Sequence, residues 1–179
     1  MENNRLQSVP CRGANHIAQY TFNAATGKLA ANGNVAVPGG VKGPRHMVFH
    51  PNKKYAYVLA EDSCSMVSYL YDATTGKLSS PEAKANFVSG SCSGETASAH
   101  VTIHPEGLYL FASNRNGQNN VVSWKVNPDT GRLTLVEVDN AGGKIANPRD
   151  FDIDPTGRYL VVANQNSSNV VVLSIDQAT

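Results

Sequence analysis

The 179-residue chain carries 15 Lys and Arg against 14 Asp and Glu, so its formal net charge is +1. This even balance gives no electrostatic basis for binding nucleic acid or an anionic membrane surface, and we expect neither partner. No run of 18 apolar residues occurs, so no transmembrane helix is expected. Residues 1–10 are polar and lack the apolar core of a signal peptide, which favours a cytoplasmic location.

The three cysteines, Cys11, Cys64 and Cys92, form no C-x-x-C motif. In a reducing cytosol they are expected to be free thiols, although a Cys64–Cys92 disulfide is the alternative. No group of Cys and His has the spacing of zinc ligands, so we expect no metal site.

One segment recurs three times at a spacing of about fifty residues. Its copies start at residues 44, 98 and 148 and read PRHMVFHP, SAHVTIHP and PRDFDIDP. A second marker, Thr-Gly-Lys/Arg-Leu, starts at residues 26, 75 and 130. Because two independent markers share one period, they indicate a structural repeat.

Each full unit is predicted to hold four short strands, A to D, because β-branched and aromatic runs alternate with Pro, Gly and Asn turns. The first unit begins at a strand C and is therefore predicted to lack strands A and B. In the second unit, strands A to D are predicted at residues 44–50, 55–61, 66–72 and within 78–89. The predicted blades span residues 13–37 (a half blade), 43–90, 97–140 and 147–179.

A four-stranded unit of this length is typical of a propeller blade, which must stack on neighbours to bury its faces. We therefore predict one all-β domain over residues 1–179, a β-propeller of about 3.5 four-stranded blades. An arc of that size leaves two blade faces open. Two copies would together supply seven blades, so self-association of two partial propellers is a further hypothesis.

Residues 43–52, GPRHMVFHPN, followed by YAYV at residues 55–58, resemble the lactonase-type seven-bladed β-propeller family. Residues 98–100, 109–115 and 147–151 resemble its next two blades, and the resemblance runs from about Asn15 to Ala178. The family includes the propeller-type 6-phosphogluconolactonase and the 3-carboxymuconate cyclase. The resemblance implies a small-molecule lactone or anionic sugar acid as ligand and no cofactor.

In a propeller, the start of strand A and the end of strand B lie at one rim of the ring. The residues predicted at this rim are Arg45, His46, Glu61, His100, Arg115, Arg149, Asp150 and Gln165. By repeat offset, Glu61, Arg115 and Gln165 are equivalent positions. They differ although the core positions agree, and an asymmetric ligand needs such variety, so the rim is the predicted binding site.

Opening a lactone requires an activated water and stabilisation of an oxyanion. We predict Glu61 as general base, with Arg45 and Arg115 holding the carbonyl oxygen or an anionic substituent. The resemblance supports these three catalytic residues, since cyclase-type members use an Arg, a Glu sixteen residues later and an Arg in the following blade. The remaining predicted substrate-binding residues are His46, His100, Arg149 and Gln165.

Simpler roles remain open for several of these residues. Arg45 and Glu61 form a structural ion pair in the alternative reading, and Arg115 is an exposed turn residue. His46 and His100 occupy equivalent places, which also fits a repeated structural hydrogen bond. Arg149 is a candidate anion ligand or a partner of Asp150 or Asp152. At the level of function, the alternatives to a lactonase are a muconate-type lactonising cyclase and a non-catalytic binding or scaffold module.

Overall fold

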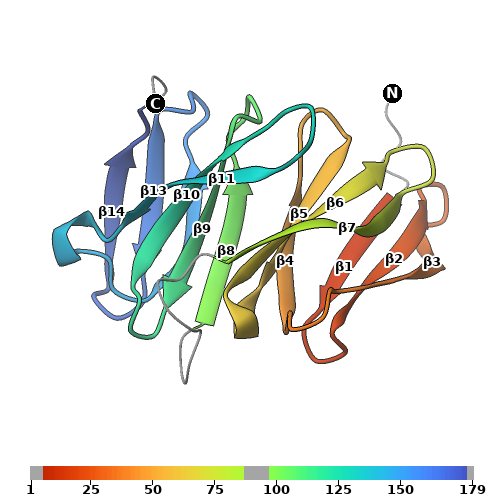
Figure 1. Cartoon of the computed structure of the whole chain (residues 1–179), viewed down its shortest axis with the longest axis horizontal. Helices are drawn as coiled ribbons and strands as arrows, with labels where there is room; N and C mark the ends of the chain where they lie inside the picture. Colours follow the sequence, from red (N-terminus) through yellow and green to blue (C-terminus); the bar gives the residue numbers. More distant parts are fainter. Residues whose placement is uncertain (1–5, 87–96, 177–179) are drawn as a thin grey trace.

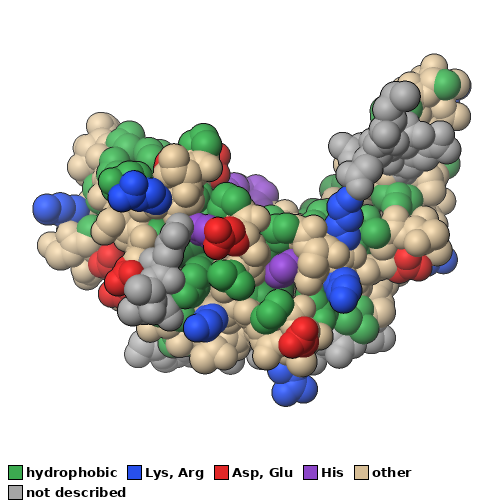
Figure 2. All heavy atoms as spheres, turned by 90° about the horizontal axis from the view of Figure 1, so that it is seen from above, with side chains coloured by type: hydrophobic (Ala, Val, Ile, Leu, Met, Phe, Trp, Pro, Cys, Tyr) green, Lys and Arg blue, Asp and Glu red, His purple; other side chains and the backbone are tan. Residues whose placement is uncertain are grey.

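The computed structural model describes residues 6–86 and 97–176, which form fourteen strands and two short 3-10 helices. The strands make four antiparallel sheets that lie side by side, from the first sheet at the right of Figure 1 to the fourth at the left. This arrangement confirms the predicted all-β propeller architecture, and each sheet is a blade. Figure 2 shows that the blades form an open arc with a hollow between its two ends.

The second and third blades are complete, and strand order follows chain order in all four. The first blade holds β1 (Leu6–Cys11), β2 (His16–Asn23) and β3 (Lys28–Ala36). The second holds β4 (Pro44–Phe49), β5 (Tyr55–Ala60), β6 (Ser65–Asp72) and β7 (Lys77–Asn86). The third holds β8 (Ala97–Ile103), β9 (Tyr109–Arg115), β10 (Asn120–Val126) and β11 (Leu133–Asp139). The fourth holds β12 (Pro148–Ile153), β13 (Tyr159–Asn164) and β14 (Asn169–Ser174).

The prediction that the first blade lacks strands A and B is wrong for strand B. β1 pairs antiparallel with β2 and begins at Leu6, before the predicted blade start at residue 13. Its sequence, LQSVPC, was not recognised as a strand because polar residues and a proline interrupt the apolar run. Pro10 is tolerated because β1 is the edge strand of its sheet. The described part of the first blade therefore holds strands B, C and D, whereas that of the fourth blade holds A, B and C.

Apolar residues fill the spaces between successive blades. The strand-B sequence YAYVLA of β5 is buried along its whole length, because one face packs on the first blade and the other on the third. On the third-blade side, Tyr57 and Leu59 pack with Trp124. A third cluster joins Phe111 to Val162 of the fourth blade. Each fully buried aliphatic side chain contributes about 1.5–3 kcal/mol, so these interfaces hold the arc together.

Histidines at the turns between strands A and B join each blade to the next. His50 bonds through Nε2 to the carbonyl of Gly107 at 3.0 Å, and His104 does the same to Gly157 at 3.0 Å. Each ring accepts a backbone N–H at Nδ1, so Nε2 is the donor. The two glycines have φ of +78° and +73°, and a Cβ would lie 2.6 Å and 2.4 Å from the facing imidazole. Glycine is required here for both its conformation and its lack of a side chain.

The cysteines differ from the expectation of free thiols. Cys64 is disulfide-bonded, whereas Cys11 is a free thiol. Cys92, the predicted alternative partner of Cys64, lies outside the described residues.

Candidate functional site

Irregular pairing at the start of strand A shapes the predicted rim. The register shifts between Pro44 and Met47, between Ser98 and Val101, and again after Pro148. Such bulges bend the strand and redirect the side chains beside them. In the second blade the bulge contains Arg45 and His46, and His46 adopts a left-handed backbone conformation with φ of +64°.

The end of strand B is tied to the start of strand A by a backbone bond. Glu61 opens the 3-10 helix η1 (Glu61–Ser63) directly after β5, and its N–H donates to the carbonyl of Gly43 at 2.7 Å. The fourth blade repeats this bond from the N–H of Gln165 to the carbonyl of Asn147 at 3.0 Å. The fold therefore places the strand-B end beside the strand-A start, as the propeller geometry predicts.

Glu61, with only 4% of its surface exposed, is the buried centre of a cluster of charges. Arg45 Nη1 donates to Glu61 Oε2 at 3.0 Å. Arg115 Nη2, which comes from the third blade, donates to Glu61 Oε1 at 2.7 Å. The structure thus brings the three predicted catalytic residues together across one blade interface. Each carboxylate oxygen accepts from one guanidinium, which leaves acceptor capacity on Glu61 for a water.

Arg115 is buried, which excludes the exposed-turn alternative for this residue. Burial lowers its pKa, the charges of Arg149 and Arg45 lower it further, and Glu61 opposes the shift. The Arg115 Nε–H is buried without a hydrogen-bond partner within the described residues. A buried donor without a partner is costly, which marks a position where a ligand oxygen would be stabilised.

A fourth charged residue, Arg12, joins the cluster and was missed by the sequence prediction. Its Nε lies 3.4 Å from Glu61 Oε2, and its Nη2 donates to Asp62 Oδ1 at 2.6 Å. Arg12 directly follows β1 just as Glu61 follows β5, so the two residues hold equivalent positions in their blades. Recognising β1 would have extended the series of equivalent rim positions to Arg12, Glu61, Arg115 and Gln165.

The predicted histidines form a second group beside this cluster. The ring centroids of His46 and His100 are 5.5 Å apart in an edge-to-face arrangement. His100 Nδ1 lies 3.1 Å from Asp150 Oδ1, and its ring also packs edge-to-face on Phe151. Burial lowers the pKa of His100; Asp150 opposes this shift and His46 adds to it. An open pocket of about 360 Å³ is lined by His100, Asp150, Phe151, Asp152 and Ala163.

The other two predicted ligands are less closely engaged. Arg149 is exposed. Its positive charge acts on the site at a distance and lowers the pKa of Arg115. Gln165 is also exposed, and its Oε1 accepts a hydrogen bond from Asn147 Nδ2 at 2.8 Å. The structure therefore brings Arg45, Glu61 and Arg115 into direct contact, with His46 and His100 paired nearby, and shows no bond from Arg149 or Gln165 to the described members of the cluster.

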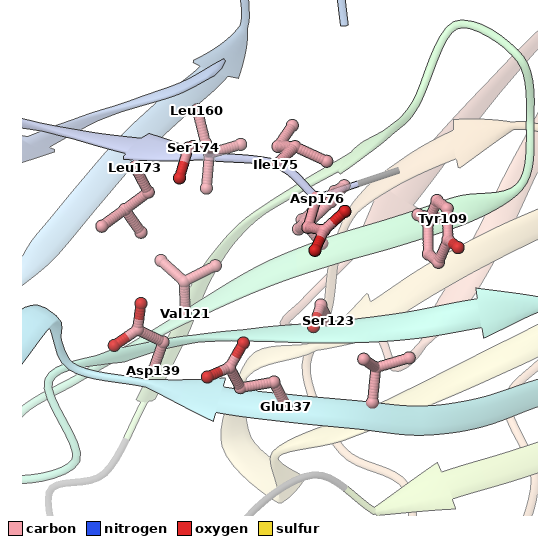
Figure 3. A pocket seen from close by; sticks show the side chains of 12 residues that line it. Tyr109, Val121, Ser123, Glu137, Asp139, Leu160, Leu173, Ser174, Ile175 and Asp176 are labelled. Carbon is pink, nitrogen blue, oxygen red and sulfur yellow. The ribbon is translucent and has the colours of Figure 1, made fainter. Parts of the chain in front are cut away.

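A smaller pocket of about 130 Å³ lies elsewhere, between the third and fourth blades (Figure 3). Glu137 and Asp139 reach it from β11, and Asp176 approaches from beyond β14. Tyr109, Leu160 and Leu173 supply its apolar lining. Because it holds carboxylates and no arginine, it is a poor place for an anionic ligand, and none of the predicted site residues lines it.

Within residues 6–86 and 97–176, no group of three or more His, Cys, Asp or Glu side chains is arranged to hold a metal ion. The helices in that same part of the chain are too short to cross a membrane.

The solved structures with similar folds include lactonase propellers. A putative 6-phosphogluconolactonase from Bacteroides uniformis superposes with a TM-score of 0.87 at 28% identity, covering 98% of this chain and 48% of that one. The periplasmic gluconolactonase of Pseudomonas aeruginosa gives a TM-score of 0.85 at 26% identity, with 96% and 47% covered.

Curated relatives agree with the structural similarity. The 6-phosphogluconolactonase of Bacillus subtilis is 33% identical over 161 residues, which are 89% of this chain and 44% of the relative. That of Pectobacterium carotovorum is 33% identical over 178 residues, covering 98% and 52%. The chain thus spans about half the length of these relatives. The family model described as "Lactonase, 7-bladed beta-propeller" matches residues 2–179, so the chain belongs to the seven-bladed β-propeller lactonase family.

Proposed function

We propose that the protein serves in the hydrolysis of a sugar lactone of the 6-phosphogluconolactone type. The observation that carries this proposal is the contact of Glu61 with both Arg45 and Arg115 at one rim, at 3.0 Å and 2.7 Å. The names of the similar proteins support it, since they are 6-phosphogluconolactonases and a gluconolactonase.

The proposed reaction uses the cluster as base and oxyanion site. A water oxygen forms a bond to the lactone carbonyl carbon, and its proton passes to a Glu61 oxygen. The negative charge that develops on the carbonyl oxygen is stabilised by a guanidinium. Arg115 is assigned this role because its Nε–H has no hydrogen-bond partner among the described residues. The ring C–O bond then breaks, and the ring oxygen takes a proton from Glu61 to leave a hydroxy acid.

His46, His100, Arg149 and Gln165 remain proposed substrate ligands. The support for His100 is its position in the lining of an open pocket and its ring contact with His46, which directly follows Arg45. The His46–His100 contact also fits a purely structural pairing of equivalent residues.

Glu61→Gln tests the proposed base. The amide keeps the shape of the side chain and cannot accept a proton at neutral pH, so lactone hydrolysis should fall by about 100-fold or more. Hydrolysis is measured as acid release from the lactone, above its spontaneous rate. Circular dichroism and thermal unfolding verify that the variant is folded. A folded variant with wild-type turnover would remove Glu61 from the mechanism.

Self-association of two copies also remains a proposal. It is supported by an uncovered apolar face on the fourth blade, where Val161 of β13 pairs with Val172 of β14 and Val170 lies beside them. Each copy supplies four sheets, so two copies would form an assembly of eight sheets rather than seven complete blades. Light scattering at micromolar concentration should give the mass of two chains, and a single-chain mass would contradict the proposal.

The cytoplasmic location likewise stays a prediction. The disulfide at Cys64 argues against it, because structural disulfides persist mainly in oxidising compartments.

A further inference from the structure

Arg12 is not needed to neutralise Glu61. The two oxygens of Glu61 already accept from Arg115 and Arg45 at shorter distances than the 3.4 Å to Arg12. The Arg12 side chain is 53% exposed, compared with 7% for Arg115. Arg12 Nη1 has no hydrogen-bond partner in the described part of the chain. The guanidinium of Arg12 therefore still offers N–H donors to a ligand from solvent. Its Nε side is held in place by Asp62.

The cluster carries an excess of positive charge. Three guanidinium groups, of Arg12, Arg45 and Arg115, face two carboxylates, of Glu61 and Asp62. Arg149 is near enough to lower the pKa of Arg115 and adds to the excess. A rim with surplus positive charge attracts an anion, and Arg offers the planar pair of donors that matches phosphate oxygens.

Asp62 holds Arg12 in this position. It accepts from both Nε and Nη2 of Arg12, at 3.2 Å and 2.6 Å to Oδ1. Gly43 leaves the space for this carboxylate, since a Cβ on Gly43 would lie 2.3 Å from Asp62 Oδ2. The arrangement links the turn after β1 in the first blade to the rim of the second, so Arg12 is oriented before any ligand arrives.

We propose that Arg12 is the specificity-determining residue that binds a phosphate group on the substrate, with Asp62 as its positioning residue. This inference rests on the proposed lactonase function and assigns the group that distinguishes a phosphorylated sugar from an unphosphorylated one. Arg45 and Arg115 remain with Glu61 at the reacting carbonyl, and Arg12 contacts the substituent at the open side of the cluster.

The test compares binding of two product acids, 6-phosphogluconate and gluconate, to the full chain by titration calorimetry. Wild-type protein should bind the phosphorylated acid about tenfold more tightly or better, because hydrogen bonds between a guanidinium and a phosphate are charge-assisted and stronger than those between neutral groups. In Arg12→Gln this ratio should fall toward one. Arg12→Lys should give an intermediate ratio, because lysine keeps the charge and loses the two-pronged geometry. Arg132→Gln, an exposed arginine in the turn before β11, is the matched control and should keep the wild-type ratio.

A wild-type ratio that persists in a folded Arg12→Gln variant would overturn the inference. A wild-type protein that binds both acids equally, or neither, would also overturn it. Failure of the proposed lactonase function is seen separately, as the absence of lactone hydrolysis by the wild-type chain. A phosphate preference that depends on Arg12 would still stand in that case.

Discussion

The two rims of the arc differ in whether equivalent positions carry the same residue in successive blades. At the turns between strands A and B, His50 and His104 make the same bond to Gly107 and Gly157 of the following blade. At the other rim, the equivalent positions at the end of strand B hold residues that differ in charge: Arg12, Glu61, Arg115 and Gln165. The same contact can stabilise every interface between similar blades, so these positions repeat. A single asymmetric ligand needs different groups around it, so the positions that bind it differ. The comparison thus separates residues that hold the blades together from residues available for chemistry.

Arg115→Met should produce the largest loss of stability, because it leaves Glu61 buried with fewer compensating charges. We expect the free energy of unfolding to fall by about 3 kcal/mol, as for other broken buried ion pairs. Urea unfolding followed by circular dichroism measures the change. The exposed Arg132→Met should cost less than about 0.5 kcal/mol. Equal small losses in both variants would show that the Arg115–Glu61 pair is not buried as described.

Gly157→Ala tests the repeated rim and should have the next largest effect. The substitution introduces a Cβ at φ +73° and places it 2.4 Å from His104 Nε2, so we expect a loss of about 2–3 kcal/mol. Gly27→Ala is the matched control, because Gly27 has φ +68° with nothing within 4 Å of its Cβ position. It should lose only about 1 kcal/mol, the cost of the left-handed conformation alone. If the two variants unfold at the same urea concentration, the His104 contact contributes nothing.

Most of the fold was predictable because each blade repeats the same local sequence pattern of apolar runs separated by turn residues. The strands predicted in the second blade match the observed ones to within a few residues, since turn residues bound each apolar run. β1 was not predictable in the same way. Its Gln7, Ser8 and Pro10 give no strand pattern, and its strand conformation depends on tertiary contacts: it pairs with β2 and contacts β4 of the second blade.

The site was predictable to the extent that it follows from the repeat. Arg45 was placed at the rim as a residue at the start of strand A, and Glu61 and Arg115 as equivalent residues at the end of strand B. The structure brings the three together. Arg12 was missed because its strand was missed. The pairing of His100 with Asp150 depends on where the bulge in strand A directs each side chain, and residue offsets do not determine that direction.

A crystal structure of the chain with bound 6-phosphogluconate would test the central claim most directly. The account predicts the sugar acid at the varied rim, with its carboxylate in contact with Arg45 or Arg115 and its phosphate on Arg12. A ligand bound instead in the pocket formed by Glu137, Asp139 and Asp176, or along the repeated histidine rim, would contradict the account.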